Sequence, residues 1–343
     1  MPLQIVNPLE IPNWDDLVLA TGKGSFFHSS AWARVLHESY GYKPVYFTYR
    51  ENGNMLGLMP FMEVDSCLTG KRGVSLPFSD YCQPLCNSKE DFQRMVLGVK
   101  KYAKEAGWRY IEWRDAGSFL GEEKDCSRYY VHSLRLEGEL ESILAGFRGS
   151  TRRNIKKALR TGVSVDILNS YDSVKEYYRM HRITRKEHGF PPQPFKFFEK
   201  IFEHVVATMK GIVVLASYRG VPVAGAIFLY SGDEAIFKYG ASDSKCHYLR
   251  PNNLVMWEAI KWCKANSFMK LNFGRTRFED RGLMQFKNGW GTKREVVKYH
   301  QYKPGKGAFM RDPGRLEKAG RFMGRLPSPI FNLVGALFYR HVG

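Results

Sequence analysis

Residues 212–240 read IVVLASYRGVPVAGAIFLYSGDEAIFKYG, and this stretch decides the fold. It contains three apolar runs rich in β-branched and aromatic residues, Ile212–Tyr218, Val223–Tyr230 and Glu234–Gly240. The turn signals Arg219-Gly220 and Ser231-Gly232-Asp233 separate them. Short apolar runs joined by tight Gly-containing turns predict an antiparallel meander of three strands.

A helix and one more strand are predicted after the meander. The helix spans residues 252–266, where apolar side chains recur at near-helical spacing: Leu254, Trp257, Ile260 and Cys263. The strand is Lys270–Phe273. Three antiparallel strands, a helix and a further strand form the order of an acyltransferase (GNAT) core, although on this pattern alone other α+β meanders fit about as well.

The sequence before the meander predicts a similar α+β unit. Its expected elements are a helix over Ala31–Tyr40 capped by Ser29 or Ser30, a hairpin around Asn52-Gly53, a helix over Lys89–Glu105 and a strand over Tyr110–Trp113. With 343 residues in total, we expect two domains, 1–135 and 136–303, followed by a tail at 304–343. The second domain also contains predicted helices over Leu140–Phe147 and Val174–His188.

The charge balance is strongly basic. The chain has 52 Lys and Arg against 34 Asp and Glu, a formal net charge of +18, while 44% hydrophobic residues suffice for packed cores. A large positive charge favours a polyanionic partner such as RNA, an anionic lipid surface or a pyrophosphate-linked substrate, and the alternative is a solvated basic surface. No helix-turn-helix, zinc-finger or aromatic RNA-binding signature supports a nucleic-acid regulator.

Cysteine spacing and the N-terminal sequence indicate the cellular compartment. The six Cys include no C-x-x-C pair, so we expect no metal site and reduced, mostly buried thiols. The first residues, Met1–Ile5, show no basic region followed by an apolar run, and no stretch reaches 18 apolar residues. We therefore expect a cytoplasmic protein.

The tail combines basic charge with an apolar segment. From residue 306 on it has seven Lys or Arg and two acids, and two short helices are expected on either side of Pro327 and Pro329. The second, Ile330–Tyr339, is apolar. The tail is expected either to pack on the first domain or to touch the inner membrane peripherally, because a basic stretch beside an apolar helix suits anionic lipid.

The segment Arg148–Arg160 (RGSTRRNIKKALR) has six basic residues and no acid. In a helix, Arg153, Lys156, Lys157 and Arg160 share one face, and like charges at these spacings repel. A bound phosphate, pyrophosphate or RNA backbone would offset the repulsion. Arg152, Arg153 and Lys156 are therefore candidate substrate-binding residues, against the alternative of a solvated basic face.

A second candidate site follows the last predicted strand. The segments NFGRT (272–276) and GLMQFKNGWG (282–291) read as polar, Gly-rich loops. Lys287, flanked by Phe286 and Trp290, could place an ammonium beside a reacting carbonyl and stabilise its oxyanion. A solvated loop lysine is the alternative reading.

Five strings in order resemble the FemAB family of peptidyltransferase-like proteins. They are FFHSSAW, SLPFSDY, STRRNIKKALRTGV, NFGRT and FKNGWG, spread over roughly residues 20–303. They are most similar to FemAB-like acetyltransferases associated with exopolysaccharide and exosortase systems. The resemblance implies two tandem GNAT-like domains and a transferase that moves an aminoacyl or acyl group onto an amine or hydroxyl of a peptidoglycan or exopolysaccharide precursor.

The resemblance also implies roles for residues. Lys287 would stabilise charge during transfer with Phe286 supporting it, and Arg152, Arg153 and Lys156 would bind substrate phosphates. We place Arg250, Arg275 and Trp290 with them as candidate substrate-binding residues. Leu36 and His37 stand near the place where peptidoglycan-bridge members tend to carry a Lys, and the helical arm of some members is absent. Both departures leave the acceptor and the tRNA donor open.

The donor is expected to be aminoacyl-tRNA or acyl-CoA, with no bound cofactor. The stretch His247–Asn253 stands where GNAT enzymes carry a Gly-rich pyrophosphate loop, and it contains Arg250 but no glycine. Pro251 has no N–H to donate, which disfavours standard CoA binding. The alternatives are an acyl-CoA-dependent N- or O-acetyltransferase and a non-catalytic module that binds an anionic glycan, lipid or RNA. No general base stands out among Asp243, Glu279, Asp280 and His300.

Overall fold

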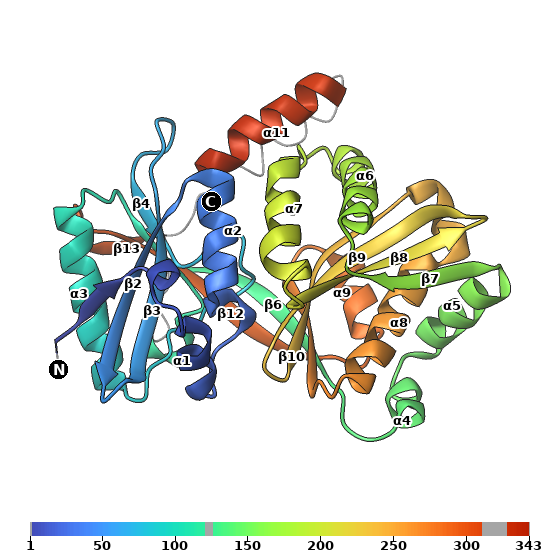
Figure 1. The fold of residues 1–343 in the computed structure, drawn as a ribbon, viewed down its shortest axis with the longest axis horizontal. Helices are drawn as coiled ribbons and strands as arrows, with labels where there is room; N and C mark the ends of the chain where they lie inside the picture. The colour runs from blue at the N-terminus through green and yellow to red at the C-terminus, as the bar shows by residue number, and fades with distance from the viewer. Residues whose placement is uncertain (1, 121–125, 311–327, 343) are drawn as a thin grey trace. The chain divides into compact units, whose positions relative to one another are not determined.

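The computed structural model describes residues 2–120, 126–310 and 328–342 (Figure 1). The chain divides into two compact units. Of the described residues, those up to 129, 296–310 and 336–342 form unit 1, and those at 130–295 and 328–335 form unit 2. Each unit is described separately below.

Unit 1 is a sheet with helices on it. Its strands run in the order β1-β2-β3-β4-β5-β12, with β13 on β12. The strands are β1 (Gln4–Val6), β2 (Lys43–Glu51), β3 (Asn54–Val64), β4 (Arg72–Val74), β5 (Ile111–Arg114), β12 (Lys293–Lys303, of which 296–303 belong to this unit) and β13 (Ala308–Met310). The helices are η1 (Pro8–Glu10), α1 (Trp14–Ala20), η2 (Phe26–His28), α2 (Ser30–Tyr40), α3 (Lys89–Glu105) and η3 (Gly117–Leu120).

Helix α3 supplies the apolar face that builds one core of unit 1. Its side chains Phe92, Met95 and Val99 are buried against Phe47 and Phe61 of the sheet. The helix begins at its Ser88 cap, whose side chain accepts a hydrogen bond from the Asp91 N–H. These apolar positions recur at helical spacing, which explains why this segment forms a helix rather than a strand.

Unit 2 has the same kind of layered arrangement. Its strand order is β6-β11-β10-β9-β8-β7. The strands are β6 (Cys126–Arg135, of which 130–135 belong to this unit), β7 (Val163–Leu168), β8 (Gly211–Tyr218), β9 (Val221–Ser231), β10 (Glu234–Ser242) and β11 (Lys270–Arg277). The helices are α4 (Leu140–Ala145), α5 (Gly149–Arg160), α6 (Tyr171–Glu187), α7 (Phe195–Ile201), η4 (Phe202–Val206), η5 (Ser244–Leu249), α8 (Pro251–Ala265) and α9 (Arg281–Asn288).

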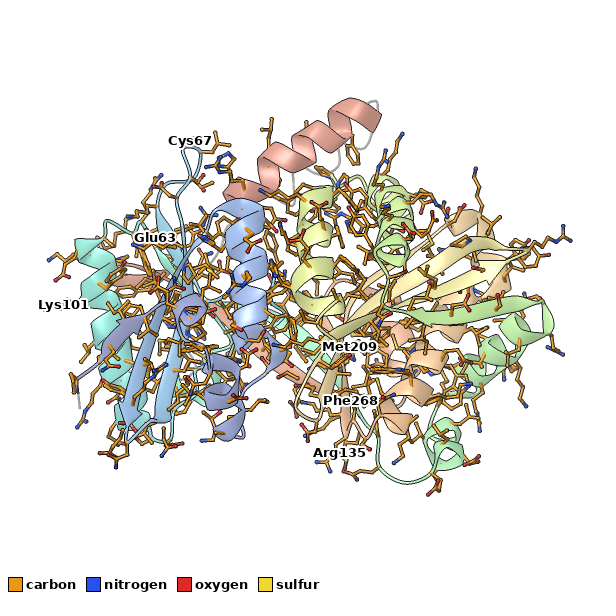
Figure 2. The ribbon with its side chains drawn as sticks, viewed as in Figure 1. Glu63, Cys67, Lys101, Arg135, Met209 and Phe268 are labelled. Atoms are coloured by element: carbon orange, nitrogen blue, oxygen red, sulfur yellow. The ribbon has the colours of Figure 1, made fainter. Side chains whose placement is uncertain are left out.

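The main core of unit 2 lies between the sheet and helix α8. Helix α8 is buried on nearly every side, including Leu254, Trp257 and Ile260, and it contacts α5 and strands β7–β9. Phe268, labelled in Figure 2, follows the helix and stacks on Trp262 with ring centroids 5.7 Å apart. Helix α6 contacts β8, β9 and β10, and Figure 1 shows it on the other side of the sheet from α8.

Both units repeat one order of elements. In unit 2, the antiparallel strands β8, β9 and β10 are followed by α8 and then by β11, which runs parallel to β10. In unit 1, the antiparallel strands β2, β3 and β4 are followed by α3 and then by β5, which runs parallel to β4. The predicted α+β class with two GNAT-like domains is therefore confirmed.

The strand next to β5 comes from far along the chain. β12 pairs antiparallel with β5, with Tyr299 opposite Arg114 and Tyr302 opposite Ile111. Residues 296–303, which we expected in the second domain, thus belong to the compact unit formed mainly by the first 129 residues. The reason is hydrogen bonding, because β5 would otherwise present an unpaired edge.

Helix α11 (Ser328–Val342) ends on unit 1. The Tyr42 hydroxyl donates to the Tyr339 carbonyl at 2.8 Å, and Arg72 Nη2 donates to the His341 carbonyl at 2.8 Å. The other helix expected in the tail lies within 311–327, outside the described residues, as does Gly343. No described helix is long and apolar enough to cross a membrane.

Candidate functional site

Lys287 lies on helix α9, not in a loop as expected from its glycine-rich surroundings. Asp280 makes the helix possible, since its carboxylate accepts a hydrogen bond from the Leu283 N–H at 3.0 Å and caps the first turn. Lys287 is in the last turn and only 2% exposed. Its Nζ donates to the carbonyls of Gly274 at 2.9 Å and Arg275 at 3.0 Å.

These two carbonyls follow the end of the β10–β11 pairing. The parallel pairs run from Glu234 opposite Lys270 to Ile236 opposite Asn272. Just beyond, the pairing of β10 with its other neighbour, β9, shifts register between Phe237 and Tyr239. Gly274 of β11 takes a φ of +69°, a conformation that glycine adopts without steric cost. The NFGRT and FKNGWG segments therefore meet, and Arg275 contributes its carbonyl to the site while its side chain is half-buried.

The aromatic residues around Lys287 form its support. Trp290 is 0% exposed, and its ring lies 5.0 Å from Phe147 and 5.9 Å from Phe286. Trp290 Nε1 is buried without a hydrogen-bond partner among the described residues. We propose that Trp290 and Phe286 hold the end of α9 from beneath, rather than that Trp290 lines a substrate surface.

The basic helix α5 packs against the same motif. The Arg148 N–H donates to the Gly289 carbonyl at 2.9 Å. A Cβ on Gly289 would lie 2.5 Å from Thr151 Oγ1, so only glycine allows this approach without a shift. The fold thus brings together the two segments singled out in the sequence, at the start of α5 and the end of α9.

The rest of α5 presents its charge to solvent. Thr151, Ile155 and Ala158 face inward, whereas four basic side chains are exposed: Arg152, Arg153, Lys156 and Arg160. Three of these, with Leu159, line a hollow of ≈ 420 Å³. Within the described part of the chain, no acidic side chain pairs with the basic residues of α5. Arg153, Lys156 and Arg160 therefore share one exposed surface, whereas Lys157 is half-buried.

Arg250 stands at the start of α8. Its backbone is left-handed, with φ of 64°, and its side chain is exposed. Pro251 is the first helical residue, and η5 precedes it, with His247 and Asn252 both hydrogen-bonded to Ser242 Oγ at 2.8 and 3.0 Å. The segment is a short helical turn instead of a glycine loop.

The structure gives none of the four residues considered as general bases a place beside the Lys287 ammonium among its recorded contacts. Asp280 caps α9, and Asp243 caps η5 through the Lys245 N–H. Glu279 is exposed. His300 belongs to unit 1, where its ring packs on Phe309 and burial lowers its pKa to about 4.

Sequence reasoning missed His132. This residue of β6 is 0% exposed, and its Nδ1 lies 3.3 Å from Thr292 Oγ1. The Thr292 hydroxyl donates to the Lys287 carbonyl at 3.1 Å. Burial, then the charges of Lys287 and Arg294, lower the His132 pKa to about 4. Its long separation from Lys287 along the chain left no local signal.

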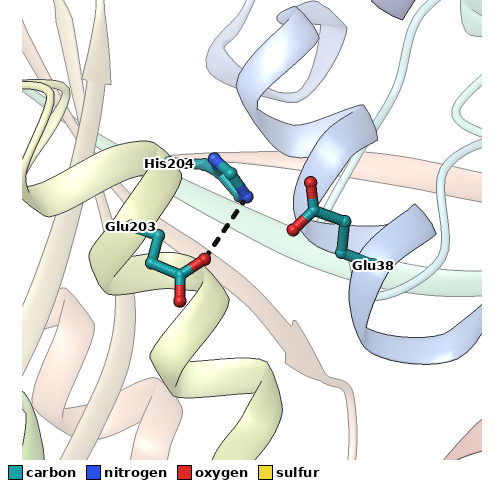
Figure 3. A group of neighbouring side chains, drawn as sticks. All are labelled: Glu38, Glu203 and His204. Atoms are coloured by element: carbon teal, nitrogen blue, oxygen red, sulfur yellow. Dashed lines mark ion pairs between the residues drawn. The ribbon is translucent and has the colours of Figure 1, made fainter.

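A different acid–imidazole pair occurs on the π-helical turn η4. Glu203 and His204 are adjacent, and the His204 Nε2 lies 3.8 Å from the Glu203 carboxylate (Figure 3). Glu38, also drawn, belongs to α2 of unit 1. Two side chains are fewer than the ligands of an ordinary protein metal site, so we assign no metal to this pair.

Part of the chain, including the candidate site, matches a known domain family. Residues 145–288 match the acetyltransferase (GNAT) domain model, and this range contains α5, β11 and Lys287. The lipid II:glycine glycyltransferase of Staphylococcus epidermidis is 29% identical over 80 residues, or 22% of this chain. The match spans only 19% of that relative's length.

Solved structures resemble nearly the whole chain. The crystal structure of FemX has a TM-score of 0.69 at 14% identity, covering 87% of this chain and 97% of FemX. A tandem GNAT protein from the clavulanic acid biosynthesis pathway has a TM-score of 0.56 at 9% identity, covering 88% and 98%. At these identities the similarity concerns the fold.

Proposed function

Because the chain belongs to the FemAB-type family, we propose that it is a transferase that moves an aminoacyl or acyl group onto an envelope precursor. The acceptor group is an amine or hydroxyl. The glycyltransferase named above acts, by name, on lipid II with glycine, which makes a lipid-linked muropeptide the first acceptor to test. An exopolysaccharide precursor is the alternative that the resemblance allows.

One observation carries this proposal: a buried lysine held at a fixed place by backbone carbonyls. Lys287 Nζ binds the carbonyls of Gly274 and Arg275 within the GNAT-like segment. A cation fixed in a site that excludes water stabilises developing negative charge far more than a solvated one, since it needs no reorganisation.

The reaction needs no bound cofactor. The acceptor N–H or O–H attacks the carbonyl carbon of the donor, a C–N or C–O bond forms, and the donor's C–O or C–S bond breaks. The proton of the acceptor finally reaches the leaving oxygen or sulfur. The charge of Lys287 stabilises the oxyanion between these two events, and the remaining rate comes from holding the reactants together.

The exposed charge of α5 suits the donor. Arg152, Arg153, Lys156 and Arg160 form a cationic surface next to the α9 motif, and a tRNA backbone presents many phosphates to such a surface. Arg250, at the start of α8, would add one more contact. The non-glycine turn before α8 offers poorer pyrophosphate binding than a Gly-rich loop, so we favour aminoacyl-tRNA over acyl-CoA as the donor.

A lipid-linked acceptor would place the protein at the cytoplasmic face of the inner membrane. We propose peripheral contact, with the basic tail at 304–343 as the candidate anchor. Much of that tail lies outside the described residues.

The test is a transfer assay with two labelled donors. The protein is incubated with lipid II and either [¹⁴C]glycyl-tRNA or [¹⁴C]acetyl-CoA, and label in the lipid fraction is counted. We expect enzyme-dependent transfer from glycyl-tRNA or another aminoacyl-tRNA. Transfer from acetyl-CoA alone would replace the donor in our proposal, and salt-sensitive binding without transfer from either donor would favour the binding module.

Neutralising the α5 face gives a separate prediction. The triple variant Arg153→Gln, Lys156→Gln and Arg160→Gln should bind total tRNA more weakly. Removing one contact to a phosphate should reduce the slope of log K against log salt by about 0.7–0.9. Binding measured from about 50 to 200 mM salt gives this slope, and removing three such contacts predicts a reduction of roughly two to three.

The matched control removes equal charge from exposed residues elsewhere. Lys43, Lys101 and Lys104 of unit 1 are exposed, and Lys101 is labelled in Figure 2. Their substitution by Gln should leave the slope nearly unchanged if α5 is the binding face. Equal slopes in the two triple variants would show that only net charge matters and would remove the assignment to α5.

A further inference from the structure

A buried imidazole nitrogen near Lys287 has no hydrogen-bond partner. The His132 side chain is 0% exposed, and its Nε2 has no hydrogen-bond partner within the part of the chain that the structure describes. Buried polar atoms in native proteins almost always have partners, and an unpaired acceptor is destabilising. An unpaired nitrogen beside a proposed catalytic lysine therefore calls for an explanation in terms of a group that binds there.

The hydrogen bonds fix which nitrogen carries the proton. The single hydroxyl hydrogen of Thr292 goes to the Lys287 carbonyl, 3.1 Å away. Thr292 Oγ1 can therefore only accept from His132 Nδ1, 3.3 Å away. The neutral ring is then protonated on Nδ1, and Nε2 carries a free lone pair.

The ring is neutral at physiological pH. Burial disfavours the imidazolium, and the positive charges of Lys287 and Arg294 disfavour it further, so the His132 pKa falls to about 4. A neutral imidazole that presents a lone pair can accept a proton, whereas an imidazolium cannot. His132 is thus kept in the form that a proton acceptor requires.

We propose that His132 Nε2 accepts the proton of the attacking amine or hydroxyl during transfer. This assignment rests on the proposed function. As the acceptor's nitrogen or oxygen forms its bond to the donor carbonyl carbon, its proton moves to Nε2. When the C–O or C–S bond to the donor breaks, the same proton passes to the leaving oxygen or sulfur, and the imidazole is neutral again.

The oxyanion makes this transfer easier than the resting pKa suggests. In the free protein, the Lys287 charge lowers the basicity of His132. When negative charge develops on the carbonyl oxygen near Lys287, it offsets that positive charge. The basicity of His132 then rises at the stage of the reaction when the proton must leave the acceptor.

The aromatic neighbour of His132 in β6, Tyr130, belongs to a stack of side chains. The Tyr130 ring stacks on Phe278 with centroids 4.1 Å apart, and the Arg294 guanidinium carbon lies 4.2 Å from the Tyr130 centroid. The Tyr130 centroid is 6.4 Å from that of His132. Phe278 is 37% exposed, so the stack reaches the surface. The proposed role of His132 requires this stack to move, so that the reacting groups reach the buried nitrogen.

Two substitutions separate proton transfer from structural support. His132→Asn keeps a donor near the position of Nδ1 for Thr292 but removes Nε2. His132→Gln places an amide near the position of Nε2 that can accept a hydrogen bond but is not basic. Both variants should lose about 10²–10⁴-fold in kcat, with KM for lipid II and the melting temperature nearly unchanged.

Hydroxylamine serves as the matched acceptor, because it attacks activated esters without help from a base. The enzyme-dependent reaction of hydroxylamine with the active donor, glycyl-tRNA or acetyl-CoA, should stay within about threefold of wild type in both variants, well below a general-base effect. Loss of this reaction together with transfer to lipid II would indicate a structural role and overturn the assignment.

The remaining outcomes are distinct. Variants that transfer to lipid II within about threefold of wild type would overturn the assignment while the proposed function stands. A wild-type protein that transfers from neither donor would overturn the proposed function, and the role of His132 with it.

Discussion

Lys287→Met should lose about 10²–10³-fold in kcat, the usual effect of removing one group that stabilises an oxyanion. Methionine keeps an unbranched chain of similar volume, so packing beneath α9 changes little. What disappears is the charge held by the Gly274 and Arg275 carbonyls. The transfer assay with wild type and variant measures the effect, and KM should change less than kcat because the charge acts mainly in the transition state.

Stability has to be followed in the same variant. The substitution leaves two carbonyl acceptors without the ammonium, at a cost of about 1–3 kcal/mol for each that stays unpaired. A circular dichroism melt therefore accompanies the assay, and kinetics are measured well below the transition. Lys287→Arg keeps the charge with a different shape and should retain part of the rate. Full turnover by Lys287→Met would remove the role assigned to this residue.

Trp290→Ala should destabilise unit 2 by about 3–5 kcal/mol, the range for removing a large aromatic side chain from a core. Trp290 is 0% exposed and contacts the rings of Phe147, Phe273 and Phe286. Its loss leaves a cavity directly below the end of α9. Urea unfolding followed by far-ultraviolet circular dichroism measures the effect, with separate transitions fitted if the two units unfold independently.

Trp290→Phe is the matched comparison. It keeps an aromatic ring in the core and removes the indole N–H, which has no partner among the described residues. Removing an unpaired buried donor is favourable by about 1–3 kcal/mol, which should offset much of the lost ring volume. A large loss of stability in Trp290→Phe would mean that the N–H has a partner, and a small loss in Trp290→Ala would contradict the core role.

Local patterns predicted the elements well. Helix α3 has the predicted bounds Lys89–Glu105, and the meander of β8, β9 and β10 lies where the Gly turns placed it. These features depend on neighbours in the chain. Their caps, turns and apolar periods are all visible within a window of about a dozen residues.

Features that depend on distant contacts were not predictable in the same way. Lys287 was expected in a loop because glycines surround it, yet the Asp280 cap and Trp290 packing make that segment helical. Trp290 was expected at a substrate surface, and only tertiary packing shows its burial. His132 and Lys287 are joined through Thr292, and no sequence periodicity reports a contact between β6, α9 and the turn that follows α9.

The origin of β12 has a consequence for synthesis on the ribosome. β5 is made early and pairs with β4 on one edge, but β12, which pairs with its other edge, begins at Lys293. Residues 130–295 can therefore emerge while the earlier unit still lacks β12. During that interval β5 is an open edge that can join a neighbouring nascent chain, so crowded translation is the stage at which this fold is most exposed to aggregation.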